Sequence, residues 1–136
     1  MNATIRKALA ITPASPARDR TVDITTIGRR SGQPRRIETW FYRAGGTVYL
    51  TGMPGKRDWY VNLKANPAFT FHLKHGVPAD LPATARAITD EAERRPILTE
   101  IVIALNQRGN PARAAQLIDI EDWIKGSSLI EVSFDE

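Results

Sequence analysis

The sequence predicts an α+β fold that is mainly β: a small barrel of mostly antiparallel strands with helices packed on it. Three observations favour it: period-two alternation in the first half of the chain, one short helical pattern among those strands, and longer helical patterns late. With 136 residues and 42% hydrophobic content, the chain can bury one sizeable core but not two, so we expect a single domain over residues 1–136. A two-layer α+β sandwich stays open.

The first three strands are predicted to form a meander. Residues 21–27 and 37–42 alternate apolar and polar side chains, so the arginine-rich residues 28–34 between them form a loop. The glycine pair at 45–46 is a hairpin signal, which makes residues 47–51 a third strand antiparallel to the second.

A short helix follows the third strand. Asp58 is positioned to cap it, and Pro67 ends it because the residue before a proline disfavours the α region. Its buried face is predicted from helical spacing to hold Trp59, Asn62, Leu63 and Asn66.

Two further strands come next. Residues 69–73 alternate and predict a fourth strand, and an irregular fifth strand ends near Ile88. Pro78 and Pro82 predict that this fifth strand lies at a sheet edge or is bulged, since a proline nitrogen cannot donate to a ladder.

The C-terminal part is predicted to be helical before a last strand. Thr89 is expected to cap an acidic first turn, and Pro96 to begin a second helical segment. Gly109 is expected to close that segment, and Asn110-Pro111 to open another helix. Alternation around Val132 predicts a short strand that returns to the sheet.

Composition removes several classes of protein. The absence of cysteine excludes disulfides and thiolate chemistry, and the longest apolar run, residues 101–105, is far below the about 20 residues of a membrane-spanning helix. The apolar stretch after Lys7 is too short for a secretory signal, so we expect a cytoplasmic protein without stable membrane insertion. Residues 1–19 are expected to be a mobile terminus; because no acid precedes Asp19, peripheral contact with the inner membrane surface is the alternative.

Three kinds of catalytic or binding site find no support. His72 and His75 are poorly spaced for metal binding on a strand, so we expect no metal. Ser31 has neither a nearby histidine nor a nucleophile elbow. The glycines of residues 52–56 are too close together for a phosphate-binding loop of the Walker type.

The net charge of +4 is concentrated in one segment. Residues 28–36 hold four arginines and no acid, which leaves the remainder of the chain at 4 − 4 = 0. Glycines let backbone amides turn toward a ligand, Ser31 adds a hydroxyl, and guanidinium groups form charge-assisted bonds. The segment suits a phosphate or several carboxylates; a solvated hairpin loop is an equal alternative.

Two motifs in this order resemble the deazaflavin-dependent nitroreductase family: TIGRRSGQPR at residues 26–35 and DWYVNLKANP at residues 58–67. The similarity spans about Thr21 to Leu105. It implies a split β-barrel of the FMN-binding type that binds coenzyme F-420 and passes a hydride from the reduced deazaflavin to a small acceptor: a quinone, a nitroaromatic or an activated alkene.

The resemblance also implies which residues bind the coenzyme. The residues expected to bind the phosphate and the acidic glutamate tail are Gly28, Arg29, Arg30, Ser31 and Arg35. Trp59 and Tyr60, beside Asp58 at the helix start, should border the ring. Arg36 is an assisting candidate, although its side chain should point opposite to that of Arg35 on a strand.

Physical reasoning adds candidates for the ring pocket at the ends of the second and third strands: Ile37, Glu38, Trp40, Thr51, Gly52 and Met53. No general acid is identifiable, so the catalytic residues stay unknown, with water and Tyr60 as candidate proton donors. Lys56 lies in a connection that is shorter than in the best-known family members, and the residues from Asn106 onward lack their tyrosine-rich substrate segment.

Two alternatives to the deazaflavin reductase stay open. One is a split barrel that uses FMN, and the other is a non-enzymatic binder of the coenzyme or of nucleic acid. We expect a small-molecule electron acceptor as partner rather than nucleic acid. The sequence leaves monomer and homodimer undecided.

Overall fold

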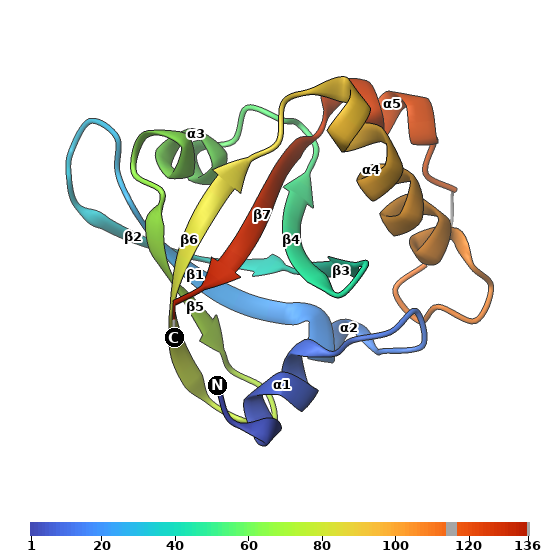
Figure 1. The fold of residues 1–136 in the computed structure, drawn as a ribbon, viewed down its shortest axis with the longest axis horizontal. Helices are drawn as coiled ribbons and strands as arrows, with labels where there is room; N and C mark the ends of the chain where they lie inside the picture. The colour runs from blue at the N-terminus through green and yellow to red at the C-terminus, as the bar shows by residue number, and fades with distance from the viewer. Residues whose placement is uncertain (114–116, 136) are drawn as a thin grey trace.

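The computed structural model describes residues 1–113 and 117–135 (Figure 1). In chain order, the elements are α1 (Ala3–Leu9), α2 (Ala17–Arg20), β1 (Thr21–Ile27), β2 (Pro34–Trp40), β3 (Tyr42–Ala44), β4 (Thr47–Gly52), α3 (Asp58–Ala65), β5 (Ala68–Leu73), β6 (Ala79–Ala87), α4 (Glu91–Asn106), α5 (Ile120–Gly126) and β7 (Ser128–Phe134). The strands form one sheet in the order β2-β1-β5-β6-β7-β4-β3, and each neighbouring pair is antiparallel. Within the described ranges, no helix is long and apolar enough to cross a membrane.

The sheet curls because its two outermost strands are consecutive in the chain. β2 and β3 are separated only by Phe41, yet they stand at opposite ends of the sheet. Phe41 is fully buried, its amide donates to the Arg20 carbonyl at 3.0 Å, and its ring meets Phe71 edge-on. The predicted three-strand meander is therefore wrong: β2 pairs with β1, whereas β3 pairs with β4.

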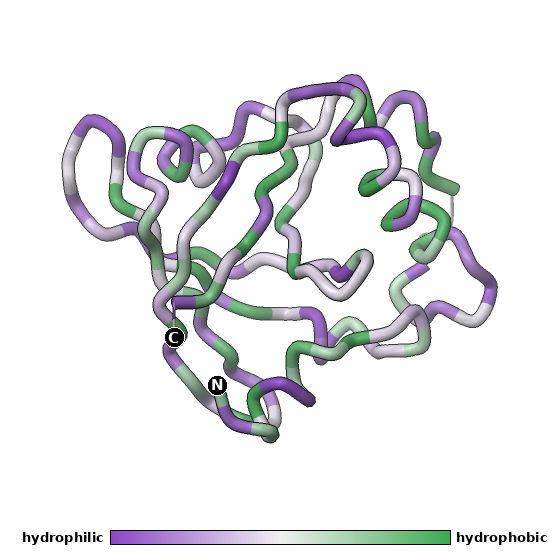
Figure 2. The backbone as a smooth tube through the Cα atoms, viewed as in Figure 1, coloured by the Kyte–Doolittle hydropathy of each residue, from purple (hydrophilic) through white to green (hydrophobic). Residues whose placement is uncertain are grey.

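The inner face of this curled sheet holds the first hydrophobic core. β1 alternates half-buried and buried residues as its sequence predicts, which turns Val22 and Ile24 inward toward Phe71 and Leu50. Along the tube in Figure 2, hydrophobic and hydrophilic segments alternate through the strands, and the loop that projects between β1 and β2 is largely hydrophilic. The predicted barrel with packed helices is confirmed.

A second core lies between the sheet and the late helices. α4 and α5 lie on the same side of the molecule (Figure 1), where Leu98 and Ile101 of α4 and Ile124 of α5 cluster with Tyr49 and Leu129 of the sheet. β4 is consequently buried on both faces, whereas the outer face of β1 and β2 remains more open.

The prediction that prolines place the fifth strand at a sheet edge or make it bulged is wrong. β6 lies in the middle of the sheet between β5 and β7, with a continuous register against β5, so it is neither an edge nor bulged there. Pro82 is tolerated because its carbonyl accepts from the Asp135 amide, beyond the last residue of β7. The nitrogen and carbonyl of one strand residue point to the same neighbour, so Pro82 removes no donor from the paired part of the β6–β7 ladder.

The predicted helix starts shift by one residue. Arg57 is the N-cap of α3 and makes no side-chain capping bond, so Asp58 is the first helical residue instead of the cap. Asp90 rather than Thr89 caps α4, with its carboxylate accepting from the Glu93 amide.

The C-terminal helices also differ from their prediction. Pro96 lies inside the continuous helix α4, where only the exposed Ala92 carbonyl loses its partner. Asn110 donates to the Ala104 carbonyl and accepts from the Ala112 amide, so it completes the end of α4 and opens no helix through residue 113. The rest of that predicted helix falls partly on residues 114–116, outside the described residues; α5 begins at Ile120.

The N-terminal segment is packed where the sequence predicts a mobile end. Asn2 caps α1 through the Ile5 amide, and Leu9 joins the first core. Arg43 of β3 donates to the Leu9 carbonyl at 3.0 Å, which ties the segment to the sheet.

Candidate functional site

The loop between β1 and β2 is a closed turn. The Gly28 amide donates to the Gln33 carbonyl and the Gly32 amide donates to the Gly28 carbonyl, each at 2.9 Å. Ser31 Oγ accepts from the Gln33 amide at 3.2 Å, which leaves the Ser31 hydroxyl hydrogen available. Gly32 has φ of 67°, a conformation that residues with a side chain rarely adopt. The loop is thus held in one shape by its own bonds.

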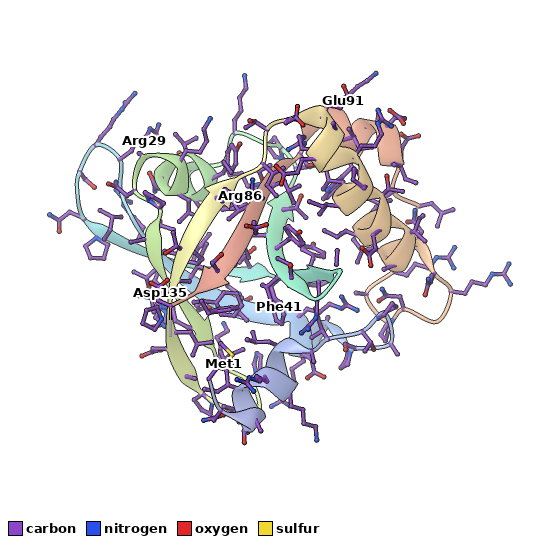
Figure 3. The ribbon with its side chains drawn as sticks, viewed as in Figure 1. Met1, Arg29, Phe41, Arg86, Glu91 and Asp135 are labelled. Atoms are coloured by element: carbon purple, nitrogen blue, oxygen red, sulfur yellow. The ribbon has the colours of Figure 1, made fainter. Side chains whose placement is uncertain are left out.

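Helix α3 fixes the base of this loop. Asn62 is buried and its Oδ1 accepts from the Arg29 amide at 3.0 Å, while Asn66 Nδ2 donates to the Ile27 carbonyl at 3.4 Å. Figure 3 shows Arg29 beside α3. These two asparagines attach the turn to the same helix that carries Trp59.

A pocket of about 330 Å³ lies between the loop, the adjoining ends of β1 and β2, and α3. Its lining consists of Thr26, Gly28, Arg29, Arg30, Ser31, Arg35, Ile37, Asp58, Trp59 and Asn62. Eight of these were predicted from the sequence. Thr26 and Asn62 were missed as site residues.

The pocket is electrostatically uncompensated. Among the described residues, the side chains of Arg30 and Arg35 have no hydrogen-bonding or ion-pair partner. Arg29 approaches Asp58 only to 3.7 Å, and the Asp58 side chain is 92% exposed, so this pair is weak. Guanidinium groups without carboxylate partners, on and beside a preformed turn, suit an anionic ligand with several oxygens.

Thr26 adds a neutral donor at the pocket floor. The residue is 1% exposed, and its hydroxyl has no partner among the described residues. Since every fully buried side-chain N or O in the described part of the chain is hydrogen-bonded, this hydroxyl must open onto the pocket that Thr26 lines. Thr26 pairs with Arg35 across the β1–β2 ladder, so their side chains share a face.

The predicted ring-binding residues are only partly brought together. Trp59 is buried at the pocket, and a Cβ on Gly52 would lie 3.8 Å from its ring, so the end of β4 borders Trp59. Tyr60 meets Trp59 edge-on with 6.2 Å between ring centroids, and Lys64 Nζ lies 5.3 Å from the Tyr60 centroid. Tyr60 does not line the pocket.

Arg36, Glu38 and Trp40 lie on the other face of β2. Strand period places them opposite to Arg35 and Ile37, as expected for Arg36. Arg36 Nε contacts Asp23 at 2.9 Å, and Glu38 pairs with Lys74, which also contacts Asp23. This ionic cluster is separate from the pocket lining.

The remaining predicted residues lie at the end of β4 and in the connection after it. Thr51 is buried and turned away, with its hydroxyl donating to the Ser128 carbonyl and accepting from Trp123 Nε1. The Met53 carbonyl accepts from Arg57, and the Met53 side chain lies near Gly126. Lys56 is exposed and has no partner among the described residues.

The curled antiparallel sheet is a split β-barrel, and the protein is an oxidoreductase of that fold. More narrowly, the chain belongs to the F420H(2)-dependent quinone reductase family, whose model matches residues 11–114. Coenzyme F420 is its cofactor.

Solved structures share the fold at low identity. An F420-H2 dependent reductase, FDR-A, is 24% identical with a TM-score of 0.53 over 84% of this chain and 94% of that one. A FAD-binding protein from Mesorhizobium loti is 13% identical with a TM-score of 0.65 over 100% and 91% of the two chains. The conserved hypothetical protein Rv2991 from Mycobacterium tuberculosis is 17% identical with a TM-score of 0.64 over 100% and 81%.

The pocket's donors fit this cofactor. Its tail carries a phosphate and glutamate carboxylates, and the pocket offers the unpaired guanidinium groups of Arg30 and Arg35 together with the open Thr26 hydroxyl. A site for neutral ligands would have no need of two unpaired cations.

Proposed function

We propose that the protein transfers a hydride from reduced coenzyme F420 to a small electron acceptor, with a quinone as the first candidate and nitroaromatics and activated alkenes as further ones. The observation that carries this proposal is the pair of unpartnered guanidinium groups beside the buried Trp59, with Arg30 on the self-closed turn and Arg35 at the start of β2.

In this proposal Arg30 and Arg35 bind the phosphate and the carboxylates of the tail. Ser31 donates its free hydroxyl hydrogen, and Thr26 donates from the pocket floor. Because the turn is closed by its own hydrogen bonds and anchored by Asn62, little ordering is needed when the tail binds.

The ring is proposed to lie toward Trp59 and the end of β4 near Gly52, since these border one another next to the tail pocket. The bound reduced deazaflavin supplies the hydride. Reduction of a quinone also consumes a proton. Tyr60 lies outside the pocket lining, so we assign proton delivery to water.

A fluorescence titration tests the tail assignment. Purified protein is titrated with F420 and with FMN at equal concentrations and at two salt concentrations. We expect saturable binding that prefers F420, and a roughly tenfold or greater loss in Arg30→Ala and Arg35→Ala, because each removes a charge-assisted contact of about 1.5 to 3 kcal/mol.

Arg36→Ala is the matched control, since Arg36 neighbours Arg35 in sequence but pairs with Asp23 on the opposite face. An equal loss of affinity in all three variants would point to a general effect of positive charge and contradict the tail assignment.

A steady-state assay tests the proton assignment. With reduced F420 and a quinone, Tyr60→Phe should keep kcat within about twofold, because the phenol hydroxyl lies outside the pocket lining. A large fall in kcat with an unchanged coenzyme affinity would instead make Tyr60 the proton donor.

A further inference from the structure

A second and larger hollow lies apart from the pocket between the β1–β2 loop and α3, which is the proposed coenzyme pocket. It has a volume of about 910 Å³ and shares none of its lining residues with the coenzyme pocket. Its walls are the segment between α1 and α2, the β3–β4 turn and the outer side of α4. This volume lies within the range of small-molecule sites, about 300–1,000 Å³.

The hollow is apolar with a basic end. Apolar side chains from two elements face it, with Ile11 and Pro13 from the N-terminal segment and Ile103 and Ala104 from α4. Ile103 is 50% exposed and is one of three exposed large hydrophobic residues among the described residues. Water-exposed isoleucine inside a concave site favours a ligand with an apolar part.

Arg20 supplies a buried charge to this hollow. It is 4% exposed, and it donates from Nε to the Ser15 carbonyl and from Nη2 to the Thr12 carbonyl. Its Nη1 has no partner among the described residues, and every fully buried side-chain N or O there is bonded, so Nη1 opens onto the hollow.

No carboxylate pairs with this guanidinium in the described part of the chain. Burial lowers the pKa of Arg20 from its ordinary value, while Tyr42 and Asp19 act in the other direction. A buried cation bonded only to neutral carbonyls is stabilised by any anion that reaches it.

Three other charged residues line the hollow, and together with Arg20 they determine its net charge. Arg43 lines the hollow and donates to the Leu9 carbonyl, again without a carboxylate partner among the described residues. Glu100 also lines it, but this residue is exposed to water, which screens its charge. Arg95 is already paired with Glu91 and Glu121.

We propose that this hollow is a second binding site, which takes a single-chain amphiphile with an anionic head. The head lies at Arg20 and Arg43, and the alkyl chain lies along Ile103 and Ile11. The wall that Arg20 holds is already built, because Thr12 and Ser15 also bond to each other across the segment between α1 and α2. The site does not depend on the coenzyme pocket.

Calorimetric titration of the full chain with dodecanoate, below its micelle concentration, tests the proposal. We expect one saturable site, with binding at least tenfold tighter than that of the neutral dodecanol. Dodecyl phosphate is the parallel probe that distinguishes a carboxylate head from a phosphate head. Equal affinities for dodecanoate and dodecanol would overturn the proposal, since the arginines would then have no role.

Variants locate the site without touching the buried Arg20. Ile103→Glu should lower dodecanoate affinity at least tenfold, whereas Leu117→Glu, a matched change at an exposed apolar residue outside the lining, should leave it unchanged. Arg43→Gln should weaken dodecanoate binding, and Glu100→Gln should strengthen it. F420 affinity should stay the same in all four variants.

Two results would overturn the assignment of the hollow. One is unchanged dodecanoate affinity in Ile103→Glu, which would place the ligand elsewhere. The other is sedimentation showing that the chain self-associates through this face, with Ile103→Glu dissociating it and with no dodecanoate bound; the hollow would then be an interface between copies.

Discussion

Arginine is used in opposite ways in two regions of this protein. Beside the β1–β2 turn, Arg30 and Arg35 are exposed, and their side chains have no partner among the described residues. Within α4, Arg94 is buried and donates to the carbonyls of Ile88, Ile124 and Ser127, each at 2.9 Å. The difference teaches that local positive charge alone does not locate a binding site. What distinguishes a binding arginine from a structural one is whether its donors are already used.

The largest effect should come from the buried arginine. Arg94→Leu leaves three carbonyls without their donor, and each buried unsatisfied group costs about 1–3 kcal/mol, so we expect a loss of about 3 kcal/mol or more in the free energy of unfolding. Urea unfolding measures it. Arg95→Leu is the control, because Arg95 is exposed and its ion pairs with Glu91 and Glu121 contribute about 1 kcal/mol or less. Equal losses of unfolding free energy in Arg94→Leu and Arg95→Leu would show that burial of the arginine makes no difference to stability.

Gly55 lies between the two regions, and its substitution should cause a loss of stability of intermediate size. A Cβ on Gly55 would lie 2.5 Å from the Gly126 carbonyl oxygen and 3.0 Å from the Ser127 carbonyl carbon, in the α5–β7 junction that Arg94 also holds. Gly55→Ala should therefore cost about 1–3 kcal/mol of stability by forcing backbone apart. It should also weaken F420 binding, because Gly55 lies in the connection from β4 to α3.

Gly109→Ala is the control for Gly55→Ala, since nothing lies within 4 Å of a Cβ at Gly109. Differential scanning calorimetry and the F420 titration check both effects. Destabilisation without any change in affinity would show that the connection does not position the coenzyme.

A smaller, pH-dependent effect is expected from a third kind of arginine, the one paired with a carboxylate. Burial opposes ionisation of Asp23, but hydrogen bonds from Lys74 and Arg36 outweigh it and hold the pKa of Asp23 below its ordinary value of 3.8. Since the folded pKa is lowered, this stabilisation is present above pH 3.8 and is lost as the pH falls through the folded pKa.

Unfolding of the wild type and Asp23→Asn from pH 7 to pH 2 tests this. The stability difference between them should stay constant down to about pH 5 and shrink below pH 3.8. A difference that does not change with pH would mean that Asp23 acts through packing and not through its charge.

The smallest effect should be that of Arg35→Ala on stability. Because Arg35 is exposed and unpartnered, its removal should change the free energy of unfolding by about 0.5 kcal/mol or less. Chemical denaturation without coenzyme measures this. A loss of stability comparable to that in Arg94→Leu would show that Arg35 is structural. It would contradict the distinction between structural and binding arginines.

Local patterns in the sequence predicted most elements, and long-range pairing explains the errors in strand order. Alternation in residues 21–27 and 69–73 predicted β1 and β5 because each has one buried face. The position of β6 in the middle of the sheet depends on where β7 ends relative to Pro82, which is a contact between residues about fifty positions apart. No local pattern encodes that contact.

The candidate site shows the same division. The arginine turn and Trp59 were predicted from motifs, but Thr26 was missed although its cross-strand partner Arg35 was predicted. The alternation of side chains along the strands was the available signal. It places Thr26 on the same face as Arg35, and it places Glu38 and Trp40 on the opposite face. The role of Asn62 depends on a bond to the Arg29 amide that joins two separate segments, so spacing alone could not reveal it.

The single-residue link at Phe41 has a consequence for how the chain folds. It separates two local hairpins, β1–β2 and β3–β4, which can each form without long loops being closed. Their relative orientation is then transmitted through one residue, so inserting a second residue beside Phe41 would turn every side chain of one hairpin to the wrong face. The exposed β1–β2 turn should therefore tolerate many substitutions, whereas the link at Phe41 should tolerate no insertion.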